Sequence, residues 1–352
     1  RPNLRQNNTE DPILTLTTQG DQTKAFTIKQ LSTSKAIKIL GIHLAPDGNF
    51  SEQLKALKSK VDELATRLRS PKLTPRDIKT FHKTMYTPAM RYILPCLAIN
   101  EEDLQPVQSQ IITSILQKLG YSSKLPTEIR YGPEELGGLG LFDLRTELGI
   151  STLKYMRDAI YSQTEAGKLM ILNVKYSQIE SGLSEPLLEH PGISIPYLTP
   201  TWITSVRQFL YQHNLSISLT DTLKIKLRGP HDRCIMNTDA LSRYSTREQG
   251  DINLVRIYLQ IITLSDMSLP DGNSACTHHL QGNRRPNQQL RQKTWPRQDL
   301  PSALQLRLWR KYISSNFMRY ANKWKQALGP INPRPNPRID NTLHHPTLQH
   351  HI

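Results

Sequence analysis

Cysteine is scarce in this sequence, and long apolar runs do not occur in it. Three cysteines in 352 residues, Cys96, Cys234 and Cys276, cannot form a disulfide framework, which favours a reducing compartment. No apolar run approaches the roughly 18 residues that a membrane-spanning helix needs, so we expect no membrane partner. Apolar residues make up 37% of the chain and prolines number 24, so part of it is expected to lie outside a packed core.

Acidic residues are outnumbered by basic ones. The chain has 45 Lys and Arg against 30 Asp and Glu, which gives a formal charge of +15 at pH 7. An excess of this size favours a polyanionic partner, and nucleic acid before a membrane surface. The length of 352 residues is sufficient for two domains of ordinary size.

The most informative stretch joins a strand signal to a basic helix. Residues 36–45 read AIKILGIHLA, a turn follows at 46–49, and residues 51–69 predict a helix capped by Ser51. Apolar residues at alternating steps of three and four predict one buried stripe: Leu54, Leu57, Val61, Leu64 and Leu68. The same stretch supplies the cations that we expect to bind nucleic acid: Lys55, Lys58, Lys60, Arg67, Arg69 and Lys72.

Further elements are expected on both sides of this helix. Residues 13–18 and 25–28 predict a β-hairpin, and the strand at 36–45 is expected to pair beside it. A second helix opens at Thr74 with a capping-box pattern, and Pro88 is expected to kink or end it. A third runs from a cap at Asn100 to Gly120. Three such helices with short connections form an antiparallel bundle.

A glycine-rich segment, 131–141, follows the third helix. Its outer glycines have the spacing of a phosphate-binding loop, but no lysine or hydroxyl residue follows them, and Glu134 and Glu135 would repel phosphate. We therefore favour a tight turn with glycines at positive φ or in close backbone approach. Another helix is expected to start near Asp143.

Candidate metal and acid–base residues are few. Cys276, His278 and His279 are ligand types, but no second pair follows at zinc-finger spacing, so a metal site is not favoured. The run 231–233, His-Asp-Arg, is interpreted as a solvated loop because no nucleophile accompanies it.

A second basic region lies toward the C-terminus. Between residues 283 and 325, eleven Lys or Arg face one acid, Asp299, and aromatics are interleaved with them. For the aromatics, among them Trp309, Tyr312 and Tyr320, we favour the buried stripe of a helix over 304–328 rather than base stacking. For the arginines of this stretch we favour nucleic-acid contact over a merely solvated face, and the site residues named here are Arg284, Arg285, Arg291 and Lys293.

Several short motifs, taken in their order, resemble the reverse transcriptases of non-LTR retrotransposons. Lys38–Ile42 looks like the "LG" strand that follows the catalytic strands, the three helices look like the thumb, and 133–141 is similar to a "GGLGL" signature beyond it. Residues 196–202, 264–266 and 271–272 look like a C-terminal extension of one retroelement group. The resemblance covers about residues 30–325.

The resemblance implies a segment that grips an RNA and DNA template–primer duplex, with the fingers and catalytic palm of the same element expected upstream. No Asp-Asp dipeptide occurs, so no catalytic residue is assigned. The intact polymerase would need Mg²⁺, and this segment is expected to hold no cofactor; nuclear localisation is implied by the resemblance alone. The alternative is a stand-alone basic nucleic-acid-binding or scaffold protein without polymerase activity.

We therefore expect a mainly α fold with a short N-terminal β-hairpin, a three-helix thumb-like bundle and a helical C-terminal extension. The expected divisions are a palm-end β remnant (1–50), the bundle with its glycine segment (51–160) and a connector (161–196). A basic helical extension (197–328) and a disordered tail (329–352) are expected to follow.

Overall fold

The computed structural model divides the chain into two units, Arg1–Thr152 and Leu153–Ile352. It describes the strands at 13–17 and 23–27, and then residues 31–316 and residue 328. Within this range the positions left out are 70–71, 98, 100, 238, 240, 270–272, 287, 289–294 and 297. The described chain is mainly helical with short N-terminal hairpins, which confirms the predicted fold class.

Two antiparallel hairpins precede the helices. Strand β1 (Ile13–Thr17) pairs with β2 (Thr23–Thr27), which confirms the first predicted hairpin. The prediction of a single strand at 36–45 that pairs with the first hairpin was wrong. The chain forms two strands there, β3 (Ile37–Ile39) and β4 (Ile42–Leu44), which pair with each other and not with the first hairpin. The reversal occurs at Leu40 and Gly41, whose φ values of 49° and 88° match the two-residue turn that hairpins favour.

The first long helix, α1 (Ser51–Arg67), follows β4 after a turn. Ser51 does not cap it, contrary to the expectation. Instead Asn49 Oδ1 accepts a hydrogen bond from the Ser51 backbone N–H at 2.9 Å, so the side chain two residues earlier satisfies the free donor of the first turn. The apolar stripe of α1 is buried as predicted, except that Leu54 is half-buried.

The second predicted helix forms as a series of segments: α2 (Pro75–Phe81), the π-helical turn η1 (His82–Tyr86), α3 (Thr87–Ile93) and the short 3₁₀ turn η2 (Leu94–Cys96). Thr74 and Asp77 form the predicted capping box at its start. Pro88 does not end the helix. A wider π turn directly before the proline is a known way to absorb the missing N–H and the ring, so the helix continues into α3.

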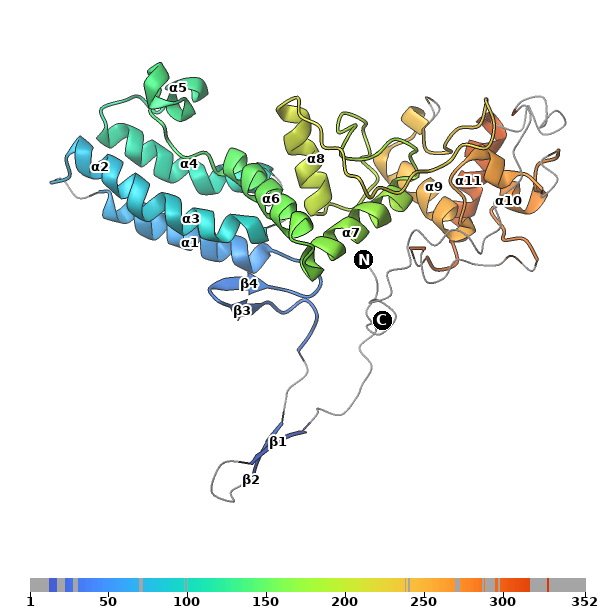
Figure 1. Ribbon diagram of the computed structural model, residues 1–352, viewed down its shortest axis with the longest axis horizontal. Coiled ribbons are helices and arrows are strands. Elements are labelled where there is room, and N and C mark those ends of the chain that lie inside the picture. The colour runs from blue at the N-terminus through green and yellow to red at the C-terminus, as the bar shows by residue number, and fades with distance from the viewer. Residues whose placement is uncertain are drawn as a thin grey trace. The chain divides into compact units, whose positions relative to one another are not determined.

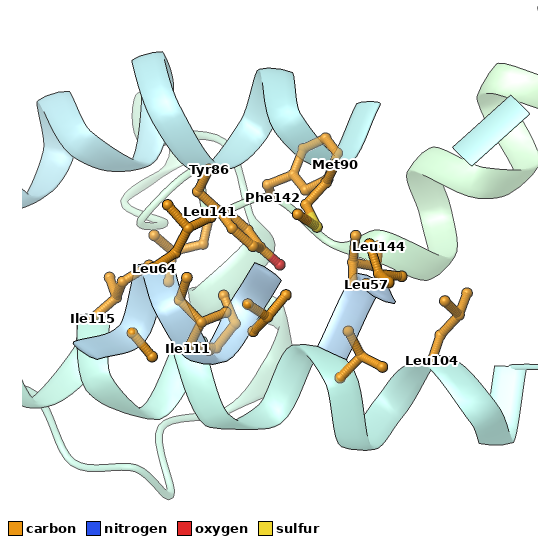
Figure 2. Close-up of a cluster of buried hydrophobic side chains, with 14 of the residues drawn as sticks. Leu57, Leu64, Tyr86, Met90, Leu104, Ile111, Ile115, Leu141, Phe142 and Leu144 are labelled. Atoms are coloured by element: carbon orange, nitrogen blue, oxygen red, sulfur yellow. The ribbon is translucent and has the colours of Figure 1, made fainter. Parts of the chain in front are cut away.

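The bundle is completed by α4 (Glu101–Lys118), which packs along α1 (Figure 1). Gly120, with φ of 82°, ends the helix, and the Tyr121 N–H returns to the Leu116 carbonyl, as predicted for a glycine terminus. Asn100, the expected cap, lies outside the described residues. Side chains from the helices meet in one apolar cluster, shown in Figure 2, that includes Leu57, Leu64, Tyr86, Met90, Leu104, Ile111 and Ile115.

Two short turns, α5 (Thr127–Tyr131) and η3 (Glu134–Leu136), lead to α6 (Leu144–Tyr161), which starts beside Asp143 as expected. The unit boundary falls within α6. Leu141, Phe142 and Leu144 enter the cluster of Figure 2, so the segment after the glycines is part of the bundle core.

The second unit combines helices with long irregular segments. The expected connector contains a full helix, α7, whose side chains belong to this unit's core, and the expected tail lies outside the described residues. The elements are α7 (Glu165–Ser181), α8 (Trp202–Gln212), η4 (Leu241–Arg243), α9 (Thr246–Leu259), η5 (Leu264–Met267), α10 (Thr277–Gln281) and α11 (Ala303–Asn316).

Tryptophan and tyrosine anchor the core of this unit. Trp309 and Tyr312 on α11 are fully buried, which confirms the preference for core over stacking at these two positions. Trp295 is also buried, and its Nε1–H donates to the Ile257 carbonyl at 2.8 Å. Tyr320 and Trp324 lie outside the described residues.

Candidate nucleic-acid interface

The predicted cations of the first unit are all on the surface. Lys55, Lys58, Lys60, Arg67, Arg69 and Lys72 are exposed. Half of them already have carboxylate partners: Lys55 with Glu52 at 2.8 Å, and Lys60 and Arg67 with Glu63 at 3.0 and 2.5 Å. The pairing lowers the pKa of Glu63, chiefly through its hydrogen bond to Lys60, so this carboxylate stays charged at neutral pH.

Helix geometry separates these cations into two groups. At about 100° of turn per residue, Lys55 and Lys58 lie about 60° apart on one flank of α1, and Arg69 follows two residues after the helix ends. Lys60 and Arg67 lie on the opposite flank. The buried stripe separates the two flanks on the core side of the helix, so a duplex that lies along one flank faces Lys55 and Lys58 and not Lys60 and Arg67. The structure therefore does not bring the six predicted cations together.

Lys58 on the first flank and Arg69 beyond the end of α1 are the better candidates. Within the part of the chain that the structure describes, neither residue forms an ion pair, and the same is true of Lys72. We call Lys58 and Arg69 the α1 basic flank. The Lys55–Glu52 pair on this side is exposed, and such pairs exchange partners at little cost.

The glycine segment forms a tight turn, as predicted. Gly137 and Gly140 have φ of 84° and 59°. Gly138 lies so close to Gly132 that a Cβ on Gly138 would be 2.2 Å from the Gly132 carbonyl oxygen. Glu134 projects from the turn toward Lys83 and Lys79, at 3.2 and 3.5 Å, so the turn presents a carboxylate to these lysines and not an open anion cradle.

Two buried polar side chains hold the end of this segment on the bundle. His82 Nε2 accepts the Phe142 backbone N–H at 2.9 Å, and Gln108 Oε1 accepts the Leu144 N–H at 2.9 Å. Burial, with a smaller effect of Lys83 that Glu134 opposes, lowers the pKa of His82 to about 4, so the ring is neutral and can accept. We did not single out His82 from the sequence; its place four residues after Ile78 and four before Tyr86, both buried, is the signal that was available.

The predicted cations of the second unit divide differently. Arg284 is half-buried: its guanidinium carbon lies 3.9 Å from the centre of the Tyr258 ring, and its Nε donates to the Tyr258 carbonyl at 2.9 Å. Arg285 is half-buried as well. Arg291 and Lys293 lie outside the described residues. Arg284 therefore already has a structural role, which the sequence pattern did not reveal.

Two further arginines are buried and hold the backbone. Arg256 is fully buried and donates to the carbonyls of Ile179, Glu180 and Ile261 at 2.7, 2.9 and 3.0 Å. Burial lowers its pKa to about 10, so it remains charged at neutral pH. Arg207 donates to four loop carbonyls, those of Leu187, His190, Pro191 and Ile193. Neither cation is accessible to a ligand.

Helix α11 carries further exposed cations. Arg307, Arg310 and Lys311 are exposed on the side of the helix opposite Trp309. They belong to the basic stretch whose arginines we favoured for nucleic-acid contact, but they are not among the four site residues named from the sequence. Their common face becomes visible once the helix and its buried side are known.

The candidate chemical residues of this unit are structural. Asp232, expected in a solvated loop, is buried and accepts hydrogen bonds from the backbone N–H groups of Arg228 and Ser265. Cys276 and His279 are buried. The described residues contain no group of three or more His, Cys, Asp or Glu that is able to hold a metal ion.

Among the helices of this same part of the chain, none has both the length and the apolar character to cross a membrane.

The geometry defines a mainly helical protein of two units, with exposed cations on α1 and on α11. No protein-family model, curated protein sequence or solved structure matches the chain.

Proposed function

We propose that this chain is the C-terminal part of a reverse transcriptase of the non-LTR retrotransposon type and contributes template–primer binding. The order of elements supports the proposal: the β3–β4 hairpin leads through one turn into α1, a compact helical bundle follows, and the glycine segment docks on that bundle. The upstream fingers and palm of the same element, Mg²⁺ for the intact polymerase and action in the nucleus are parts of this proposal.

The α1 basic flank carries the binding role. Lys58 lies on α1, whose other side is fixed in the core, and Arg69 follows directly after the buried Leu68, so both charges are presented to solvent from anchored backbone. Cations of this kind neutralise phosphates and release counterions, which gives affinity that is independent of sequence and falls with salt. In this proposal the segment holds the duplex, and the carboxylates for polymerisation belong to the upstream part.

A pair of variants on the two flanks of α1 tests the proposal. We expect Lys58→Gln with Arg69→Gln to weaken binding of an RNA–DNA hybrid, because each lost phosphate contact lowers the slope of log affinity against log salt by roughly 0.9. The matched control is Lys60→Gln with Arg67→Gln, which removes the same charge from the opposite flank. Fluorescence anisotropy at several salt concentrations measures both. An equal effect of the two pairs would contradict the α1 assignment.

The alternative is a stand-alone nucleic-acid-binding or scaffold protein, and one observation favours its scaffold form. The first unit has 20 Lys and Arg against 16 Asp and Glu, so this unit is close to neutral. A scaffold role predicts negligible affinity for the hybrid even at low salt. A primer-extension assay with the upstream polypeptide added in trans separates the two functions: extension that depends on this chain supports the polymerase assignment, and extension that is independent of it argues against that assignment.

A further inference from the structure

We infer that the exposed face of α11 is a separate binding site for the phosphate backbone of a nucleic-acid duplex. The site consists of Arg307, Arg310 and Lys311, which we call the α11 basic face. It lies in the second unit and does not depend on the thumb-like role proposed for α1.

The three cations are neighbours on one surface of the helix. Positions i, i+3 and i+4 share a helix face, and at about 100° per residue the three side chains span an arc of about 100° centred opposite Trp309. No acidic residue occurs in the sequence of α11. Among the ion pairs of the described residues, none involves Arg307, Arg310 or Lys311.

The opposite side of α11 keeps this face in place. Trp309 Nε1 donates to the His279 carbonyl at 2.9 Å, and the Tyr312 hydroxyl donates to the Ile235 carbonyl at 2.6 Å. Both rings are fully buried, so rotation of the helix would expose them and break both hydrogen bonds. The cations are therefore presented by a helix whose orientation within its unit is fixed by the core.

The same burial determines which part of a nucleic acid is recognised. Trp309 and Tyr312 are the two aromatic residues of α11, and neither is available to stack on a base. A face of cations without exposed aromatics contacts phosphates and does not read the bases. Binding should therefore tolerate any sequence and should not favour single strands.

The sequence on both sides of α11 is also basic, which favours a polyanion. Residues 283–352 contain 13 Lys and Arg against two Asp. Two acids of α9 lie near α11: Glu248, whose pKa is lowered mainly by Ser245 and least by Lys311, and Asp251, whose Oδ1 accepts a hydrogen bond from Gln305 Nε2 at 2.8 Å. Glu248 is one residue from the exposed Arg247. The two acids therefore offset part of the positive charge and leave a net positive surface.

A membrane surface fits this helix less well. A helix that lies on a membrane needs an apolar stripe facing the lipid. The apolar stripe of α11 is used by the core through Trp309, Tyr312 and Ile313, and Leu304 is the exposed large apolar side chain that remains on the helix. A duplex with regularly spaced phosphates is the partner that the exposed face matches.

The test uses the full chain with the triple variant Arg307→Gln, Arg310→Gln, Lys311→Gln and a labelled DNA duplex of random sequence. We expect the slope of log affinity against log salt to fall by about 2 to 3, since each phosphate contact contributes roughly 0.9. The matched control is Lys154→Gln, Lys224→Gln, Lys226→Gln, which removes three exposed charges elsewhere in the same unit. Unchanged tryptophan fluorescence and an unchanged melting temperature show that the variant is folded.

Three results would overturn the inference. The first is a salt slope equal to that of the wild type. The second is an equal loss in the control, which would indicate a net-charge effect. The third is loss of binding to vesicles with anionic lipids while duplex affinity is retained, which would identify a lipid site. Because the α1 basic flank is unchanged in the triple variant, failure here leaves the proposed function standing, and failure of the α1 variants leaves this site standing.

Discussion

The two units of this protein use their basic residues in different ways. The first has 20 Lys and Arg against 16 acids, and several of its surface cations are paired with carboxylates. The second has 25 against 14, buries Arg207 and Arg256 among backbone carbonyls, and within the described chain has no ion pair at the α11 basic face. The total charge of +15 therefore does not locate a binding surface; the location depends on which cations remain free.

The cores differ for a related reason. The first unit packs long helices whose backbone groups bond to each other, so apolar contact accounts for most of its cohesion. The second unit contains irregular segments, and their carbonyls need partners from elsewhere. Arg207 and Arg256 supply these partners. The second unit should therefore be the more sensitive to loss of a single polar side chain.

The largest expected effect is a loss of stability of the second unit in the variant Arg256→Met. The change leaves the carbonyls of Ile179, Glu180 and Ile261 without their donor, and each buried unpaired group costs about 1–3 kcal/mol. We expect the free energy of unfolding of the second unit to fall by about 3–5 kcal/mol. All four tryptophans lie after residue 200, so tryptophan fluorescence during urea unfolding reports on this unit.

The control for this variant is Arg243→Met, which removes an exposed cation from the same unit and should change stability by less than about 0.5 kcal/mol. Circular dichroism at 222 nm also follows the helices of the first unit. If the two variants have equal effects on the tryptophan-detected transition, the buried arginine does not have the role described.

A smaller loss of stability is expected in the first unit at low pH, where His82 becomes protonated. The pKa of His82 is about 4 in the folded state and 6.5 when unperturbed, so the unfolded chain binds the proton more readily. The contribution of His82 to stability is complete above pH 6.5 and is lost as the pH falls from 6.5 to 4. A difference of this size corresponds to about 3 kcal/mol. Circular dichroism during urea unfolding at pH 7 and pH 4 measures it.

The control for His82 is His82→Gln, which offers an acceptor for the Phe142 N–H without titrating. Carboxylates such as Glu63 and Asp77, whose pKa values are lowered by hydrogen bonds to Lys60 and Thr74, are present in both proteins, so the difference between the two pH profiles isolates His82. Parallel profiles for wild type and variant would show that protonation of His82 does not weaken the docking of the glycine segment.

Much of the fold was predictable because the signals are local. The stripe of α1, the capping box at Thr74, the terminus at Gly120 and the tight turn at 131–141 each depend on residues within one or two turns. The division of the 36–45 strand was harder, because Leu40 adopts a positive φ that leucine rarely has. No residue pattern near Pro88 indicated that a π-helical turn would let the helix continue past this proline.

The candidate sites were less predictable because they depend on the third dimension. The sequence placed Lys58 and Lys60 in one group, and the helix separates them onto opposite flanks. The burial of Trp295 depends on the Ile257 carbonyl 38 residues earlier in the chain. The α11 basic face required knowledge of which side of that helix is buried, which only the packing of Trp309 supplies.

The smallest expected effect concerns Arg284, the residue on which the sequence-based and structural interpretations differ most directly. Its guanidinium stacks on Tyr258 and donates to the Tyr258 carbonyl, so Arg284→Gln should lower the stability of the second unit by about 1 kcal/mol. The affinity of this variant for a duplex should remain close to that of the wild type.

The single variant Arg307→Gln should do the reverse, with unchanged stability and weaker, less salt-dependent binding. Urea unfolding and anisotropy on the same two proteins measure both quantities. If Arg284→Gln weakens binding as much as Arg307→Gln, the division between structural and free cations in this unit is wrong, because Arg284 would then contact phosphate while it packs on the ring.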